Sequence, residues 1–383
     1  MGESAFQRMV NGTVAALLIV TMCFGGSAEA VEVEPLEIGA AAPDFALEGV
    51  DGQTYTLASF ADAEVLVVLF TCNHCPTAQA YEERIIKLVD DYKNRGVELV
   101  AISPNDAEAV RLDELGYSDL GDTLEDMKIR ARDHGFNFPY LYDGDTQEAT
   151  MKYGPIATPH VFVFDKERKL RFEGRIDNNE DPRERTTDET RDAIDAVLAG
   201  RAVEVETTRV FGCSIKWSDK RADAVAALER WNAEAAELND LDVAGVKALM
   251  KNETDNTLLI NIWATWCGPC VTEFPHLVEI NRMYRGRDFK MVTIAVNDDR
   301  DAAFKFLNKN AASMTNYFLT ESDLDEFAEA LDPAWRGAFP YTIIVKPGGE
   351  VVYRHSNAID PLEVRREIVD QVSRFYFKLV EEE

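Results

Sequence analysis

The sequence predicts an α/β protein with two domains of one design, each a central mixed β-sheet flanked by helices. At two places, an apolar run typical of a buried strand leads into a Cys-x-x-Cys pair and then into a helical pattern, at Cys72/Cys75 and at Cys267/Cys270. Each pair is followed later in the chain by a proline that opens a strand and a hairpin. A mature chain of about 350 residues also exceeds what one hydrophobic core usually organises.

The first 30 residues have the pattern of a secretory signal peptide. Arg8 supplies a positive charge, residues 14–24 are apolar, and Ala28-Glu29-Ala30 has the small-x-small form of a cleavage site. The apolar stretch is shorter than the roughly 20 residues that a membrane-spanning helix needs. We therefore expect an exported, periplasmic protein whose mature chain starts near Val31. The alternative is an uncleaved N-terminus that tethers the protein to the membrane.

Charge and cysteine content exclude some classes of protein. A formal net charge of −29 opposes binding to phosphate backbones and anionic lipid, so we expect no nucleic-acid partner, and a membrane partner only if the N-terminus stays uncleaved. Beyond the predicted signal peptide, the cysteines are two Cys-x-x-Cys pairs plus Cys213. An odd number does not build a framework of structural disulfides, so these are predicted to be redox or metal-binding cysteines.

The first domain is predicted at residues 36–218, and its patterns alternate between strand and helix. Uninterrupted β-branched and apolar runs indicate buried strands, and apolar residues at helical spacing indicate helices packed on them. The expected elements are strands at 65–70 and 97–103, helices at 82–88 and 124–134, a hairpin at 161–165 and 170–173, and a closing helix at 188–198.

The second domain is predicted at residues 242–383 and repeats this order. Residues 219–241 carry apolar side chains at helical spacing and are expected to form a connecting helix. The other expected elements are strands at 258–262 and 289–296, helices at 271–284, 301–307 and 324–331, a hairpin at 342–345 and 350–353, and a closing helix at 361–377 that begins with a proline.

The first cysteine of each pair is the predicted nucleophile. A thiolate at a helix N-terminus is stabilised by unpaired backbone N–H groups and by the helix dipole. We expect Cys72 and Cys267 to be the accessible, acidic, attacking thiols. Cys75 and Cys270, one turn further on, are then the buried resolving thiols, each close enough to form a readily reduced disulfide.

The stretch from Trp263 to Cys270, which contains Trp-Cys-Gly-Pro-Cys, resembles the thioredoxin active site. Thioredoxins usually carry a buried Asp where this chain has Asn261. The extension from Cys270 to Pro275 resembles the Cys-x-x-Glu-Phe-Pro of the TlpA-like branch, exported thioredoxins that reduce apocytochrome c. This resemblance implies that Glu273 handles the proton of Cys270. The alternative is that Glu273 is an acid in the first helical turn that only favours the helix dipole.

Two prolines complete the resemblance to thioredoxins. Pro159 in Ala-Thr-Pro-His and Pro340 in Phe-Pro-Tyr each open a strand and resemble the cis-proline of that family. The resemblance implies that each proline faces its cysteine pair and that a substrate strand pairs beside it. Two thioredoxin-like domains in tandem are therefore expected.

The first domain as a whole resembles the redoxin branch, which is related to the peroxiredoxin-like AhpC/TSA proteins. The peroxidase pattern P-x-x-x-[ST]-x-x-C is missing, since Val65 and Val68 stand seven residues before Cys72 and Cys75. A peroxide-reducing, antioxidant first domain is thus only an alternative.

His74 precedes the second cysteine of the first pair, an arrangement that resembles protein disulfide isomerase and the periplasmic dithiol oxidase. The resemblance implies that a cationic His74 stabilises a thiolate on Cys72 and makes the disulfide more oxidising. A solvent-exposed histidine without effect is the alternative.

Residues 210–217 contain Gly-Cys-Ser-Ile-Lys-Trp and resemble an element that follows the redoxin domain in relatives. We expect this segment to form a strap packed against the first domain. Cys213 within it is either a third redox partner for Cys72 or a small buried residue.

These patterns predict an exported thiol–disulfide oxidoreductase that acts on protein disulfides or dithiols. The sequence has no Gly-rich phosphate loop, no HExxH and no nicotinamide or flavin fingerprint, so we expect no cofactor. Electrons must then come from a thiol donor, a membrane thiol reductase being one candidate. The alternative is copper delivery through Cys72, Cys75, His74 and His160, although copper-delivery thioredoxins usually have Cys-x-x-x-Cys.

Overall fold

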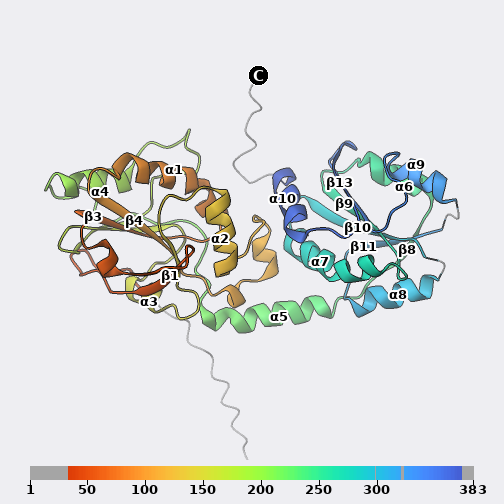
Figure 1. Cartoon of the computed structure of the whole chain (residues 1–383), viewed down its shortest axis with the longest axis horizontal. Helices are drawn as coiled ribbons and strands as arrows, with labels where there is room; N and C mark the ends of the chain where they lie inside the picture. Colours follow the sequence, from red (N-terminus) through yellow and green to blue (C-terminus); the bar gives the residue numbers. More distant parts are fainter. Residues whose placement is uncertain (1–32, 298, 321–322, 373–383) are drawn as a thin grey trace, which may run out of the picture. The chain divides into compact units, whose positions relative to one another are not determined.

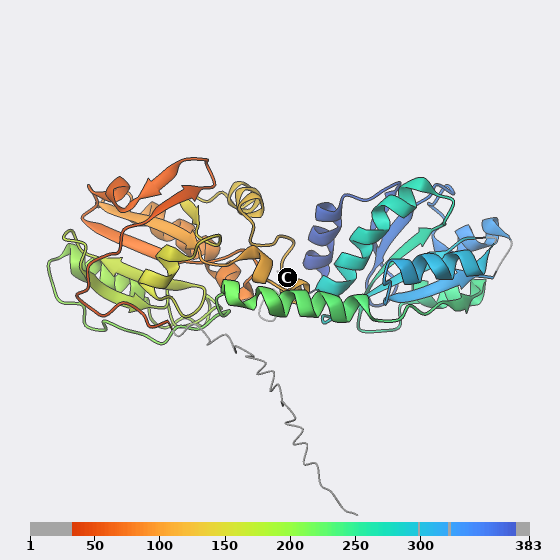
Figure 2. The same ribbon diagram turned by 90° about the horizontal axis from the view of Figure 1, so that it is seen from below.

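The computed structural model describes residues 33–297, 299–320 and 323–372, and the predicted signal peptide lies outside them. These residues form two sheets, each with helices on both faces, as the two views show (Figure 1, Figure 2). Within the described ranges, no helix has both the length and the apolar composition needed to cross a membrane.

The first sheet has the strand order β2-β1-β5-β4-β3-β6-β7. Its strands are β1 (Ala46–Gly49), β2 (Thr54–Thr56), β3 (Val65–Phe70), β4 (Val97–Ser103), β5 (Tyr140–Tyr142), β6 (His160–Phe164) and β7 (Leu170–Gly174). Its α-helices are α1 (Pro76–Tyr92), α2 (Leu124–Asp133), α3 (Glu148–Tyr153) and α4 (Glu189–Leu198), and short 3-10 helices are η1 (Leu57–Phe60), η2 (Ala107–Ala109) and η3 (Leu112–Leu115).

The central strand β3 is apolar at every position because both of its faces are buried. It runs parallel to β4 and antiparallel to β6, and all six of its residues are buried. Val65, Val67 and Leu69 belong to the core with α1, α2 and α4, whereas the alternate residues Leu66, Val68 and Phe70 belong to the core with α3. A strand covered on both faces has no polar side to present to water. The chain therefore leaves β3 from the middle of the domain and enters the cysteine segment directly.

The second sheet has the order β13-β12-β9-β10-β11-β8. Its strands are β8 (Asn239–Leu241), β9 (Thr257–Trp263), β10 (Phe289–Ala295), β11 (Thr315–Leu319), β12 (Tyr341–Val345) and β13 (Val351–Ser356). Its helices are α6 (Val243–Lys251), α7 (Gly268–Tyr284), α8 (Arg300–Lys309), α9 (Leu324–Leu331) and α10 (Pro361–Gln371), and η4 (Ser218–Lys220) with α5 (Arg221–Asn232) come before them.

The second domain repeats the central arrangement of the first. Strand β9 runs parallel to β10 and antiparallel to β12, as β3 does with β4 and β6. Helices α7, α8 and α10 pack on one face of this sheet, and α6 and α9 pack on the other. The predicted fold class, two α/β domains with mixed sheets flanked by helices, is confirmed.

The predicted connecting helix over residues 219–241 is too long. Helix α5 ends at Asn232, and residues 239–241 form β8, an edge strand of the second sheet that pairs in parallel with β11. Leu238 and Leu241 bury their side chains in the second domain. Helix propensity is a weak preference that tertiary burial overrides, so helical spacing alone could not locate this change.

Replacing Leu241 by Ala tests this boundary. Because Leu241 is a buried strand residue, Leu241→Ala should lower the free energy of unfolding of the second domain by about 2–5 kcal/mol. Denaturant unfolding followed by circular dichroism measures the change. Leu228→Ala is the matched control, because Leu228 is exposed on α5 and should change stability by only about 0.5 kcal/mol or less. Equal losses would contradict the burial of Leu241 in the second domain.

Candidate redox sites

The second domain holds its cysteine pair at the start of α7. Cys267 is the N-cap residue, and the backbone N–H of Cys270 donates to its Sγ at 3.2 Å. The two cysteines form a disulfide in the structure. Cys267 retains 6% exposure and follows Trp266, which is 63% exposed, whereas Cys270 is fully buried. Cys267 thus lies at the helix N-terminus and is slightly more exposed than Cys270.

Glu273 lies one helical turn beyond Cys270 and is buried. The Asn261 side chain donates through Nδ2 to Oε1 of Glu273 at 2.9 Å, and the backbone N–H of Ile359 donates to Oε2 at 2.9 Å. Burial raises the pKa of Glu273 above its usual value, although these two donors oppose the shift. The alternative of an acid in the first helical turn is wrong, because α7 begins at Gly268 and has no acid in its first turn.

Strand pairing fixes which cysteine of the first domain corresponds to Cys267. In the first domain Phe70 pairs with His160, the residue after Pro159. In the second domain Ile262 pairs with Tyr341, the residue after Pro340. Five residues beyond these two strand positions stand Cys75 and Cys267. Both are N-cap residues, of α1 and α7 respectively, so Cys75 is the counterpart of Cys267.

The two Cys-x-x-Cys pairs therefore do not occupy equivalent positions. By the same count, Ala78 stands where the second domain has Cys270, and Cys72 stands where it has Ala264. The prediction that Cys72 lies at the helix N-terminus is wrong. The physical reason is Pro76, which occupies the first position of α1 and starts the helix after the second cysteine, because proline needs no N–H donor there and has a helical φ.

The first-domain sulfurs also differ from expectation in burial and acidity. Cys72 is buried, so it is not an accessible thiol, and its Sγ lies 3.2 Å from Oγ1 of Thr158. Burial raises the pKa of Cys72 well above its usual value. Burial also acts to raise the pKa of Cys75, but hydrogen bonds from Cys213 and Cys72, the charge of His74 and the Ala78 N–H outweigh it and bring it well below the usual value. Cys75 is thus the acidic thiol.

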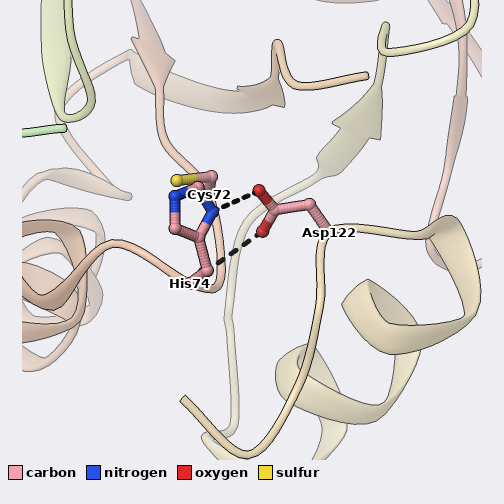
Figure 3. Close-up of side chains that lie close together, drawn as sticks. All are labelled: Cys72, His74 and Asp122. Atoms are coloured by element: carbon pink, nitrogen blue, oxygen red, sulfur yellow. Dashed lines mark hydrogen bonds and ion pairs between the residues drawn. The ribbon is translucent and has the colours of Figure 1, made fainter. Parts of the chain in front are cut away.

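His74 forms a buried ion pair with Asp122 (Figure 3). Its Nδ1 lies 2.5 Å from Oδ2 of Asp122, and the backbone N–H groups of Asn73 and His74 donate to Oδ1 at 2.9 and 3.1 Å. Burial acts to lower the pKa of His74, but the charge of Asp122 and this hydrogen bond outweigh it and raise the pKa. The alternative of an exposed, ineffective histidine is wrong. The His74 charge helps to lower the pKa of Cys75, whereas burial raises the pKa of Cys72 although its sulfur lies within 4.8 Å of a His74 ring nitrogen.

The four residues considered for copper are not assembled into one set of ligands. Both ring nitrogens of His160 are engaged, because Nδ1 accepts from the Ile156 N–H at 3.3 Å and Nε2 lies 2.7 Å from Glu173. The ligand atoms of Cys72, His74 and Asp122 do lie within 4.8 Å of one another. Both oxygens of Asp122, however, already accept hydrogen bonds from the protein, so a metal would have to displace them.

Both predicted cis-prolines are found, at Thr158-Pro159 and Phe339-Pro340. In the first domain, the residue before the proline touches both sulfurs, because Cys75 Sγ, in its thiol form, donates to the Thr158 carbonyl oxygen at 3.2 Å and Cys72 Sγ lies near the Thr158 hydroxyl. In the second domain the ring of Trp266 packs against Phe339, with ring centroids 5.4 Å apart.

Sequence reasoning missed Asp122 and Thr158. Asp122 comes 47 residues after Cys75 (122 − 75) and has no motif around it, so only the fold places it beside His74. Thr158 could have been predicted from the sequence, because it directly precedes Pro159, which is itself a predicted site residue.

Fold and cysteine geometry together define a protein with two thioredoxin-like domains. Residues 38–173 match the AhpC/TSA family and residues 232–371 match the Redoxin family. The chain therefore contains two redoxin/AhpC-TSA thioredoxin-like domains in tandem.

The curated relatives are named as thiol–disulfide enzymes. Thiol-disulfide oxidoreductase ResA from Bacillus subtilis is 26% identical over 125 residues, which cover 33% of this chain and 60% of the relative. Thiol:disulfide interchange protein DsbE from Yersinia pestis is 30% identical over 119 residues, which cover 31% of this chain and 58% of the relative. The chain thus spans about 60% of the length of these relatives.

Solved structures are also similar to this chain. A hypothetical protein, SMc02350 from Sinorhizobium meliloti 1021, is 34% identical, with 49% of this chain and 97% of that chain covered and a TM-score of 0.43. A putative DsbE from Chlorobium tepidum is 22% identical, with 43% and 99% covered and a TM-score of 0.33.

Titration of the first-domain thiols tests the assignment of Cys75. In a Cys267→Ser, Cys270→Ser background, the ultraviolet thiolate absorbance at mildly acidic pH should vanish with Cys75→Ser and persist with Cys72→Ser. Asp122→Asn removes the counter-charge that keeps His74 cationic, so the Cys75 thiolate should then protonate at higher pH. Asp90→Asn, an exposed acid on α1, is the control and should leave the titration unchanged. A thiolate that disappears with Cys72→Ser would reverse the assignment.

Proposed function

We propose that this protein is an exported thiol–disulfide oxidoreductase that exchanges electrons with protein disulfides through a reactive cysteine in each domain. The observation that carries the proposal is the shared position of Cys75 and Cys267. Each is the N-cap residue of the helix that follows the central strand, and each Sγ accepts a hydrogen bond from a first-turn N–H. Such a position favours the thiolate, which is the form that attacks a disulfide.

In the second domain, the reduced Cys267 thiolate attacks one sulfur of a substrate disulfide. A mixed disulfide forms, and the other substrate sulfur leaves as a thiolate. Cys270 then loses its proton and attacks Cys267 Sγ, which releases the second substrate sulfur and leaves the Cys267–Cys270 disulfide seen in the structure. Two electrons pass to the substrate, and a thiol donor restores the pair.

Glu273 is proposed to accept the proton of Cys270 in this step. Its burial one turn from Cys270 and its raised pKa suit proton exchange with a thiol, since transfer is most efficient between groups of similar proton affinity. Asn261 and the Ile359 N–H hold its two oxygens, which fixes the carboxyl group in place.

In the first domain, Cys75 is proposed as the attacking thiolate, with His74 and Asp122 maintaining its charge. Pro159 and Pro340 are proposed to border the place where a substrate chain approaches each reactive cysteine. Cys72 is close enough to Cys75 for a hydrogen bond and remains a candidate second sulfur.

Export to the periplasm is proposed from the N-terminal sequence pattern, which lies outside the described residues. A membrane thiol reductase is the electron donor that fits an exported site without a cofactor. Peroxide reduction is not favoured, because Val68 stands seven residues before Cys75, where the peroxidase pattern has Pro, and Cys72 stands three residues before it, where the pattern has Ser or Thr.

Trapping with resolving-cysteine variants tests the function. Cys270→Ser should accumulate a mixed disulfide with a protein disulfide substrate at Cys267, because the second attack is lost. Reduction of insulin disulfides should fall to the uncatalysed rate in a Cys75→Ser, Cys267→Ser double variant. Activity that survives in this double variant would refute the proposal.

Glu273→Gln tests proton handling in the second domain. The variant should slow release of reduced substrate from the mixed disulfide by about 10²-fold or more while leaving its formation unchanged, because general acid–base catalysis contributes about 10²–10⁴-fold. Single-turnover kinetics over a range of pH separate the two steps. Glu279→Gln on the same helix is the control, since Glu279 is only half-buried. Equal release rates in Glu273→Gln and wild type would show that Glu273 has only a structural role.

A further inference from the structure

The strap, residues 210–217, crosses the reactive face of the first domain. Its Cys213 pairs with Thr158 through two backbone hydrogen bonds, from the Thr158 N–H to the Cys213 oxygen at 2.9 Å and from the Cys213 N–H to the Thr158 oxygen at 3.2 Å. This antiparallel bridge is the contact of two strands, although the strap is otherwise irregular. The strap thus lies against the residue that touches both sulfurs of the Cys72/Cys75 pair.

The pairing brings a third sulfur to the site. Cys213 packs against Cys72, Cys75 and Ala78. Any extended chain that delivers a sulfur to Cys75 beside Thr158 would use the same two backbone groups of Thr158. The strap therefore occupies the place of an incoming substrate strand.

The second domain shows the same place without a strap. Phe339 precedes Pro340 as Thr158 precedes Pro159, and its backbone makes no hydrogen bond with the rest of the described chain. Trp266, next to Cys267, is largely exposed. The covering of the reactive cysteine is thus a property of the first domain alone among the described residues.

The close approach of the strap depends on Gly212. This residue has φ +145°, and a Cβ added to it would lie 1.9 Å from the Thr158 oxygen, a distance that no side chain tolerates. Beyond Cys213 the strap is held at Lys216. Its oxygen accepts from the Asp106 N–H and from Gln147 Nε2, both at 2.9 Å, and its N–H donates to Asn105 Oδ1 at 2.9 Å. The strap is therefore anchored beyond Cys213 at Lys216 and passes in close contact with Thr158 at Gly212.

We propose that Cys213 is the redox partner of Cys75 and that the strap is an internal substitute for a substrate strand. The inference rests on the proposed function and names the resolving sulfur of that site. Ala78 stands where the second domain has its resolving Cys270, so the second sulfur of the first domain must come from another position, either Cys72 or Cys213. An external substrate must displace the strap to reach Cys75, and the strap must return to complete the reaction.

The cycle is balanced in sulfur, electrons and protons. The Cys75 thiolate attacks a substrate disulfide, and one substrate sulfur leaves as a thiolate and takes a proton. When the strap returns, Cys213 gives its thiol proton to the departing substrate sulfur, and the Cys213 sulfur attacks Cys75 Sγ. A Cys75–Cys213 disulfide forms and the second substrate sulfur is released. Two electrons have passed from the two cysteines to the substrate disulfide, and a thiol donor reverses the bond.

Mapping of disulfides tests the proposal in the full chain with Cys267→Ser and Cys270→Ser. After oxidation with oxidised glutathione, digestion and mass spectrometry should find Cys75 linked to Cys213. Cys72→Ser should leave this bond in place. Cys213→Ser should keep glutathione on Cys75 at least tenfold longer, because no resolving thiol remains. A Cys72–Cys75 bond with Cys213 as a free thiol would overturn the proposal. If glutathione and protein disulfides react with Cys75 in no variant, the proposed function itself fails for this domain.

A strap variant gives a second readout that does not depend on Cys213 chemistry. Gly212→Val should lift the strap and speed alkylation of Cys75 by iodoacetamide at least tenfold. Gly135→Val is the matched control, because Gly135 also has positive φ (+65°) but no atom within 4 Å of the added Cβ. Circular dichroism confirms that both variants are folded. Equal alkylation rates in the two variants would show that the strap does not cover Cys75.

Discussion

Both redox sites depend on one interaction, the hydrogen bond from a first-turn backbone N–H to a cysteine sulfur at the N-cap of a helix. The Ala78 N–H donates to Cys75 Sγ at 3.4 Å, and the Cys270 N–H donates to Cys267 Sγ at 3.2 Å. The position of each helix start is determined by the buried strand that precedes it. That strand is in turn held by its hydrogen bonds to the neighbouring strands of the sheet. A sulfur at this position gains negative charge at little cost, because unpaired donors already point at it. The second sulfur can then come from different parts of the chain in the two domains.

The central strands and the long helices could be predicted from the sequence, because burial on both faces leaves a local signal. The run from Val65 to Phe70 is apolar at every position, and β3 has these same bounds. The short strands β5 and β8 lack such a signal, since each has only three residues and pairs with strands distant in sequence. Long-range pairing, rather than local propensity, makes them strands.

In the second domain Cys267 begins the helix and Pro340 is cis, as the sequence predicts, whereas in the first domain Cys75 rather than Cys72 begins the helix. A Cys-x-x-Cys spacing does not state which cysteine begins the helix, and the nearby proline does. Pro269 comes two residues after Cys267, the first cysteine of its pair, whereas Pro76 comes directly after Cys75, the second of its pair. The two helices therefore start at different members of their pairs. Partners such as Asp122 depend on a loop brought in from elsewhere in the fold, and no spacing rule could reveal them.

The anchoring of the strap has a consequence for the charge of the site. The Lys216 N–H donates to Oδ1 of Asn105, and the other end of the same amide donates through Nδ2 to Asp122 Oδ2 at 2.7 Å. Asp122 in turn holds His74. Release of the strap would remove the contact between Lys216 and Asn105. Because Asn105 also holds Asp122, release of the strap and ionisation of His74 are thermodynamically linked, and each affects the other. With the proposed opening of the strap, the charge at this site would therefore depend on whether the strap covers Cys75.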